Sequence, residues 1–179
     1  MPRTRKFYFI MMIFISCLGC DQISKRVAKT TLEQAAPKTY LWETFRLQYA
    51  ENSGAFLSLG SNLPKTVRTW LFTIISGALL IGLLIYIILN RELDRSHIFA
   101  LSLILGGGAS NLIDRIINDG KVIDFMNMGI GSLRTGIFNW ADVVIMAGMG
   151  LIVLYNFSAR KKDDGDASQE AESVKNAQN

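Results

Sequence analysis

Four long apolar segments separate shorter polar ones in this sequence, and they limit the possible folds more than any other feature. A helix needs about 20 predominantly apolar residues to cross a bilayer. The segments predict spans at about residues 7–28, 67–89, 98–117 and 137–157. The first holds an apolar run of only about 14 residues and reaches full length by continuing through its polar end. We therefore predict a membrane α fold, a bundle of four transmembrane helices.

The segment between the first two spans has the pattern of β-structure. In Thr44–Tyr49, apolar and polar residues alternate with period two, which is typical of a half-buried strand. Asn52–Gly54 is a turn signal, and Ala55–Leu57 is apolar again. We predict a small β-hairpin within about residues 40–60, resting on the outer membrane face, with Val122–Phe125 as an additional strand.

Basic residues near the span ends orient the bundle. They cluster before the first span, between the second and third, and after the fourth, which places all three clusters on one side of the membrane. Both termini are therefore predicted to be cytoplasmic, although the opposite side also carries lysines and arginines. Residues 1–159 form the predicted membrane domain. Residues 160–179 are polar, mixed in charge and without periodicity, which predicts a disordered cytoplasmic tail.

Composition argues against two soluble functions. The net charge is +4, but the basic residues lie beside apolar runs and no nucleic-acid motif accompanies them. Cys17 and Cys20 have C-x-x-C spacing without the βαβ context of a redox site, so we interpret them as packing residues. The residues before Cys20 also resemble a lipoprotein signal, but three further spans favour a membrane helix. Gly106–Gly108 is interpreted as a close helix contact.

Ionisable side chains inside membrane spans are energetically expensive, which makes them functional candidates. Asp142 is the clearest case, because it lies a few residues into the fourth span with no lysine or arginine within a helical turn. Asn139 precedes it by three residues and is predicted to share its helix face. Further polar residues that share a helix face are Asn111, Asp114 and Arg115 in the third span, and Asp21 and Lys25 at the end of the first.

The predicted topology brings these residues to the outer membrane face, together with Asn52 and Asp124. The single histidine, His97, falls at the cytoplasmic end, which argues against Ser–His catalysis and an H-E-x-x-H zinc site. Two nearby carboxylates in a poorly solvated pocket tend to share one proton. The charged member can activate a water while the neutral member donates a proton. For the other residues, anchoring ion pairs and interhelical hydrogen bonds remain open as structural roles.

Five motifs in this order are similar to a known family. They are Asp21-Gln22-Ile23-Ser24-Lys25, Asn52-Ser53-Gly54-Ala55, Gly106-Gly107 through Asn111-Leu112-Ile113-Asp114-Arg115, Val122-Ile123-Asp124-Phe125 and Phe138-Asn139-Trp140-Ala141-Asp142. Together they closely resemble the bacterial prolipoprotein signal peptidases (signal peptidase II) over roughly residues 7–157. Ser110 departs from the family pattern, which has glycine before the asparagine, and this affects only local helix packing.

The resemblance implies an intramembrane aspartic endopeptidase of the bacterial inner membrane, with Asp124 and Asp142 as its catalytic dyad near the outer face. It implies cleavage of diacylglyceryl-modified prolipoproteins just before the lipid-modified cysteine. The expected partners are these signal peptides and membrane lipid, and we expect a monomer without cofactor or metal. Asp114 matches the motif with a structural role left open. The implied supporting residues are Asp21, Lys25, Asn52, Gly54, Asn111, Arg115 and Asn139.

Two functions of other classes fit the sequence less well than a peptidase. A small proton-coupled transporter or channel component would also use intramembrane carboxylates. However, the polar residues crowd one face instead of forming a path across the bilayer, and no inverted repeat is evident. A membrane adaptor that binds through its outer hairpin would leave Asp142 without a purpose.

Overall fold

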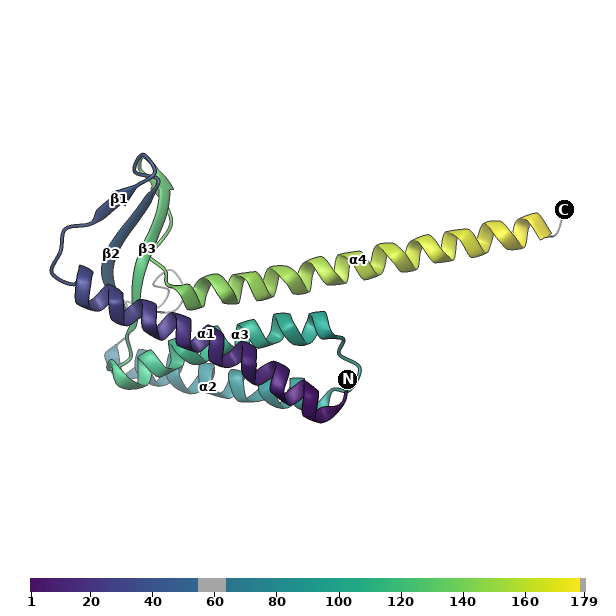
Figure 1. Cartoon of the computed structure of the whole chain (residues 1–179), viewed down its shortest axis with the longest axis horizontal. Coiled ribbons are helices and arrows are strands. Elements are labelled where there is room, and N and C mark those ends of the chain that lie inside the picture. The colour runs from purple at the N-terminus through teal and green to yellow at the C-terminus, as the bar shows by residue number, and fades with distance from the viewer. Residues whose placement is uncertain (55–63, 178–179) are drawn as a thin grey trace.

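The computed structural model describes residues 1–54 and 64–177 and combines four long helices with a small antiparallel sheet (Figure 1). The helices are α1 (Arg3–Leu32), α2 (Lys65–Leu89), α3 (Arg95–Ile117) and α4 (Trp140–Ala177). In each of them, one stretch is long and apolar enough to cross a membrane: Arg3–Leu32, Thr69–Leu89, Arg95–Ile117 and Trp140–Ser158. This confirms the predicted four-span membrane fold.

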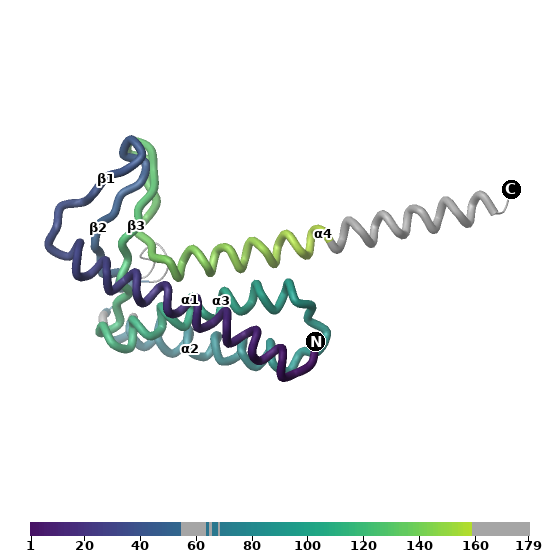
Figure 2. Tube along the Cα trace, viewed as in Figure 1, coloured from purple at the N-terminus to yellow at the C-terminus, as the bar shows by residue number. Residues whose placement is uncertain are grey.

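Helix α3 is the centre of the bundle, because it packs against α1, α2 and α4 (Figure 2). Apolar side chains from three helices meet where Ile10 of α1, Ile87 of α2 and Ile98 of α3 are buried together. Most of the other side chains on α2 remain exposed in the isolated chain. An apolar helix with so little protein around it is suited to contact lipid along much of its length.

The sheet lies at one end of the helices (Figure 1) and has the order β1-β2-β3-β4, with antiparallel neighbours throughout. Its strands are β1 (Lys38–Tyr40), β2 (Phe45–Asn52), β3 (Val122–Ile130) and β4 (Leu133–Arg134). The added strand predicted at Val122–Phe125 is thus confirmed as the start of β3. The predicted return strand, Ala55–Leu57, lies outside the described residues, and β2 pairs instead with β1 and β3.

Helix boundaries differ from the predicted spans at both ends of α4. The helix begins at Trp140 instead of residue 137, because Phe138 forms a β-bridge with Met126. It also continues as helix to Ala177, whereas the sequence predicted a disordered tail from residue 160. Beyond residue 160 the sequence contains several alanines, glutamates and lysines and no proline. Alanine, glutamate and lysine have high helix propensity and proline is the strongest helix breaker, so this composition is compatible with a continued helix in spite of Gly165.

Two glycines let α3 approach its neighbours closely. A Cβ atom on Gly106 would lie 2.8 Å from Cys17 Cβ in α1, and one on Gly107 would lie 2.7 Å from the Ala141 carbonyl oxygen in α4. Real Cβ atoms essentially never come so near to other atoms. The interpretation of this glycine segment as a close helix contact is therefore confirmed.

We expect Gly107→Ala to lower the free energy of unfolding by about 1–3 kcal/mol, because the new methyl group must push α3 and α4 apart. Gly82→Ala is the matched control, since nothing lies within 4 Å of its added Cβ. That change should be neutral or stabilise α2 by up to about 1 kcal/mol through helix propensity. Denaturant unfolding in detergent measures both, and equal stabilities of the two variants would contradict the close contact.

Candidate active site

Asp124 lies on β3, where pairing with β2 brings it next to Asn52. Ala50 is the direct partner of Asp124 and Asn52 is the partner of Val122, which places Asn52 diagonally across from the carboxylate. The Asn52 Nδ2 group donates a hydrogen bond to Asp124 Oδ2 at 2.9 Å. Its own Oδ1 accepts from the Gly54 N–H at 2.9 Å, an Asx turn that fixes the amide's orientation.

Asp142 is held by the first turn of α4. The Asn139 N–H donates to Asp142 Oδ2 at 3.1 Å, and the Asp142 N–H donates to Asn139 Oδ1 at 3.0 Å. This reciprocal pair is a capping box, in which the residue before the helix and the third residue inside it satisfy each other's backbone N–H groups. The prediction that Asn139 shares a helix face with Asp142 was therefore wrong, since Asn139 precedes the helix and caps it.

Two asparagine amides connect the aspartates. Asn139 Nδ2 lies 2.6 Å from Asp124 Oδ1 and 3.1 Å from Asn111 Oδ1. Asn111 Nδ2 in turn donates to Asp142 Oδ1 at 3.0 Å. Both carboxylates thus accept hydrogen bonds from amides that are themselves fixed, and this leaves little freedom for either one to turn away.

A buried lysine supports this arrangement from α1. Lys25 is 2% exposed, and its Nζ lies 2.6 Å from Asp21 Oδ2, 2.9 Å from Asp114 Oδ2 and 2.7 Å from Asn111 Oδ1. An ammonium group has three N–H donors, so all of them are used. Because the Asn111 Oδ1 atom accepts a hydrogen bond from Lys25, the amide is oriented so that its NH₂ group faces Asp142 and donates to it.

The two carboxylates around Lys25 extend the network to other elements. Asp21 Oδ1 accepts from the Ala141 N–H in α4 at 2.8 Å, and Asp114 Oδ2 accepts from the Ile123 N–H in β3 at 3.1 Å. Ala141 and Ile123 directly precede Asp142 and Asp124 in the chain. The ion cluster therefore fixes the backbone beside each aspartate, which favours the structural role left open for Asp114.

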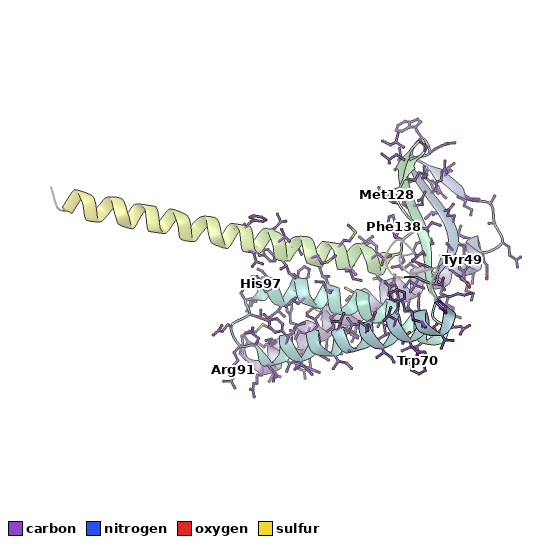
Figure 3. All side chains as sticks on the ribbon, turned by 180° about the vertical axis from the view of Figure 1, so that it is seen from behind. Tyr49, Trp70, Arg91, His97, Met128 and Phe138 are labelled. Atoms are coloured by element: carbon purple, nitrogen blue, oxygen red, sulfur yellow. The ribbon has the colours of Figure 1, made fainter. Side chains whose placement is uncertain are left out.

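Arg115 connects α3 to the end of β2. Its Nη2 donates to the Gly54 carbonyl oxygen at 3.2 Å, and Nη1 lies 3.4 Å from the Asn111 carbonyl oxygen. Gly54 is buried in this position. All nine predicted site residues are therefore joined in one network. His97 lies at the opposite end of the bundle (Figure 3), as predicted.

Both aspartates line a cavity of about 530 Å3 whose remaining walls are largely apolar. Asn52, Asn111 and Arg115 contribute polar groups at the aspartate end. The apolar walls come from three helices: Leu79, Leu80 and Leu83 of α2, Ile104 of α3, and Ile145, Met146 and Met149 of α4. The cavity thus combines titratable groups with space for a hydrophobic chain, as expected of a binding site.

Burial sets the electrostatics of Asp124. Removal from water raises the pKa of Asp124 to about 7, hydrogen bonds from Asn52 and Asn139 oppose the rise, and the negative charge of Asp142 adds to it. At neutral pH this carboxyl group is therefore poised to hold or to release a proton. Among the described residues, no three His, Cys, Asp or Glu side chains are grouped as metal ligands.

Sequence reasoning missed the contribution of Gln22 and Ser110. Gln22 Nε2 donates to Asp114 Oδ1 at 2.9 Å and to Ser110 Oγ at 2.8 Å, and these contacts tie α1 to α3 beside the ion cluster. Ser110, the departure from the family pattern, is thus an added hydrogen-bond acceptor. The available signal was the position of Gln22 next to Asp21, because a polar residue at a membrane-buried helix contact needs a partner.

Known proteins resemble this chain in sequence and in fold. Residues 13–158 match the family model described as signal peptidase (SPase) II. A lipoprotein signal peptidase of Francisella tularensis subsp. novicida is 34% identical over 161 residues, which are 89% of this chain and 97% of that protein. One from Borreliella burgdorferi is 30% identical over 167 residues, with 89% and 96% covered.

A solved structure described as a bacterial membrane enzyme has a TM-score of 0.74 and 25% identity, covering 86% of this chain and 90% of that one. A second structure with the same description has a TM-score of 0.68 and 26% identity, covering 82% and 90%. Both agree with the arrangement of helices and sheet described above. The family match covers most of the chain, including every residue of the hydrogen-bonded network around Asp124 and Asp142. The chain therefore belongs to the signal peptidase II family of membrane peptidases.

Proposed function

We propose that this chain is an intramembrane aspartic endopeptidase that removes signal peptides from diacylglyceryl-modified prolipoproteins. It cleaves the peptide bond just before the lipid-modified cysteine. The observation that carries this proposal is the pair of buried aspartates, Asp124 and Asp142, held by Asn139 and Asn111 at the polar end of an apolar cavity. The relatives named lipoprotein signal peptidase support the same substrate class.

The two aspartates act as one coupled pair that shares a single proton. The charged member accepts a proton from water as the water oxygen bonds to the scissile carbonyl carbon. The neutral member donates its proton to the carbonyl oxygen. When the C–N bond breaks, the cysteine nitrogen takes up a proton and leaves as an amine, while the signal peptide keeps the new carboxyl group. The fixed amides of Asn52, Asn111 and Asn139 hold both carboxylates in place, which lowers the cost of reorganisation.

The cavity suits a substrate with hydrophobic and polar parts. Its apolar walls on α2 and α4 face the signal peptide and the acyl chains, and the dyad contacts the peptide bond. We place the dyad near the outer membrane face and both termini in the cytoplasm, because the basic residues Arg3, Arg91 and Arg95 lie at the opposite end of the helices. The enzyme works as a monomer in the bacterial inner membrane, with every proposed site residue supplied by one chain.

Cleavage of two matched precursors tests the proposed substrate. The purified protein in detergent is given one precursor with diacylglycerol on its cysteine and an identical one without it. Mass spectrometry of the products should show cleavage of the lipidated precursor only, with the lipid-bearing cysteine as the new N-terminal residue. Equal cleavage of both precursors, or cleavage at another bond, would contradict the proposal.

The dyad should also give the reaction a characteristic pH dependence. Because the pKa of Asp124 is about 7, kcat/KM should fall as pH rises above about 7, where the pair loses its shared proton. Asn52→Ala removes a hydrogen bond that lowers this pKa, so the alkaline limb should move to higher pH. Gln48→Ala, on the same strand but outside the cavity, is the control. An alkaline limb that stays in place in Asn52→Ala would argue against Asp124 as the titrating group.

A further inference from the structure

A second cavity lies at the end of the bundle opposite the dyad. It has a volume of about 400 Å3, and its walls include Arg3 and Lys6 of α1, Ile88 of α2, Arg91 and Leu93 of the α2–α3 connection, and Ile98 of α3. Figure 3 shows Arg91 at this end, far from the sheet. None of the residues that carry the proposed peptidase reaction lines this cavity, so the reaction does not account for it.

The basic and acidic side chains of the α2–α3 connection line different cavities. Arg91 faces the second cavity, whereas Glu92 and Asp94 line a different one together with His97. The Asp94 carboxylate contacts His97 there: its Oδ1 accepts a hydrogen bond from the His97 N–H at 2.7 Å and lies 2.9 Å from His97 Nδ1. Among the residues that the structure describes, the lining of the second cavity therefore contains three cationic side chains and no acidic one.

These cationic side chains still have N–H donors with which they can bind an anion. Lys6 is 8% exposed, and its Nζ donates to the Asn90 carbonyl oxygen at 2.6 Å. That bond uses one of the three N–H donors of the ammonium group. Within residues 1–54 and 64–177, none of Arg3, Lys6 and Arg91 forms an ion pair.

The start of α1 adds to the positive potential at this cavity. The helix begins at Arg3 after Pro2, has no side-chain cap and has no acidic residue in its first turn. The first N–H groups of a helix lack intrahelical partners, and the helix dipole places partial positive charge there. A helix N-terminus of this kind is a favourable site for phosphate oxygens.

We propose that this cavity binds the phosphodiester group of an anionic glycerophospholipid from the leaflet opposite the dyad. Basic pockets between transmembrane helices bind anionic headgroups in this way. A lipid fits better than a soluble phosphate because Ile88, Leu93 and Ile98 give the cavity an apolar side. Ile88 is 48% exposed on α2, the helix with the least protein around it, so acyl chains can continue along that helix.

Lipid titration of two double variants distinguishes specific binding in the cavity from nonspecific attraction to a positively charged surface. Arg3→Gln/Arg91→Gln removes two cations from the cavity, and both side chains are exposed, so folding should be unaffected. Arg5→Gln/Arg95→Gln removes two exposed cations from the same end of the bundle without touching the cavity. Native mass spectrometry in a neutral detergent, with phosphatidylglycerol added, measures the dissociation constant of each protein. Thermal unfolding without added lipid checks that both variants are folded.

We expect the cavity variant to bind phosphatidylglycerol roughly 30-fold more weakly than the wild type. The matched variant should change affinity by about threefold or less at physiological salt, because exposed charges are screened. Equal losses in the two variants would overturn the site in favour of general surface attraction.

Three competing ligands identify the chemistry that is recognised. Phosphatidylcholine should bind more weakly than phosphatidylglycerol, since its headgroup has no net charge, and diacylglycerol should not bind at this cavity. Glycerol 3-phosphate without acyl chains should fail to displace the lipid at millimolar concentration. Displacement of the lipid by micromolar glycerol 3-phosphate would assign the cavity to a soluble phosphate and would contradict the proposal that it binds a lipid. None of these measurements depends on peptidase activity.

Discussion

Replacing either Asp124 or Asp142 with asparagine is expected to reduce kcat for the lipid-modified precursor by about 10⁴-fold. An asparagine amide can neither accept a proton from water nor donate one to an oxyanion at neutral pH. Asp142→Asn is the cleaner change, because the new Oδ1 can still accept the Asn139 N–H and preserve the capping box. Substrate binding should therefore survive while turnover is lost.

Asp119→Asn is the matched control for the loss of one carboxylate. Asp119 is exposed and follows α3 in the connection to β3, with φ of 56°. Asparagine accepts this left-handed conformation readily, so the fold should be kept. The gel shift of the precursor, followed with enzyme in excess, measures all three variants. Near-normal cleavage by Asp142→Asn would rule out the two-aspartate mechanism, whereas a loss in Asp119→Asn would show that any missing carboxylate disturbs the enzyme.

Lys25→Met is expected to lower the free energy of unfolding by about 3–5 kcal/mol. Methionine matches much of the lysine side chain in shape, but it leaves Asp21 and Asp114 buried without their cation. The loss should be larger than for an ordinary surface ion pair, because both carboxylates are buried. Lys29→Met, one turn further along α1 at an exposed position, should change stability by less than about 0.5 kcal/mol.

Urea unfolding in detergent measures both lysine variants. If Lys25→Met were as stable as Lys29→Met, the buried ion cluster would not hold the helices together. We also expect Lys25→Met to lower activity, since Lys25 Nζ orients Asn111, whose amide donates to Asp142. Stability and activity are coupled here because one amide belongs to both networks.

Much of the site could be predicted from the sequence because charges are costly in a membrane. Asp21, Lys25, Asn111 and Asp142 stand out against long apolar runs, and alternating span directions place them on one face. The structure joins them directly, through Lys25 to Asp21 and Asn111 and through Asn111 to Asp142. The roles of Asp124 and Asp142 as a catalytic pair remain a proposal.

The contacts that depend on three-dimensional geometry could not be predicted in the same way. Helical periodicity placed Asn139 on the fourth helix. In the structure, Phe138 is still extended and bridges to Met126, so Asn139 precedes α4 and caps its N-terminus. Pairing of β2 with β1 was missed because Lys38–Tyr40 has no alternating pattern. Gln22 was overlooked because a neutral amide does not stand out as a charge does.

The most direct test of the central claim, that Asp124 and Asp142 work as one unit, is the rate of the double variant. Single-turnover cleavage of the diacylglyceryl-modified precursor is measured for the wild type, Asp124→Asn, Asp142→Asn and Asp124→Asn/Asp142→Asn. If the pair shares one proton and one function, the double variant should be no slower than either single variant, because groups that act as a unit are strongly non-additive. Losses that multiply in the double variant, or cleavage that survives in either single variant, would contradict the shared mechanism.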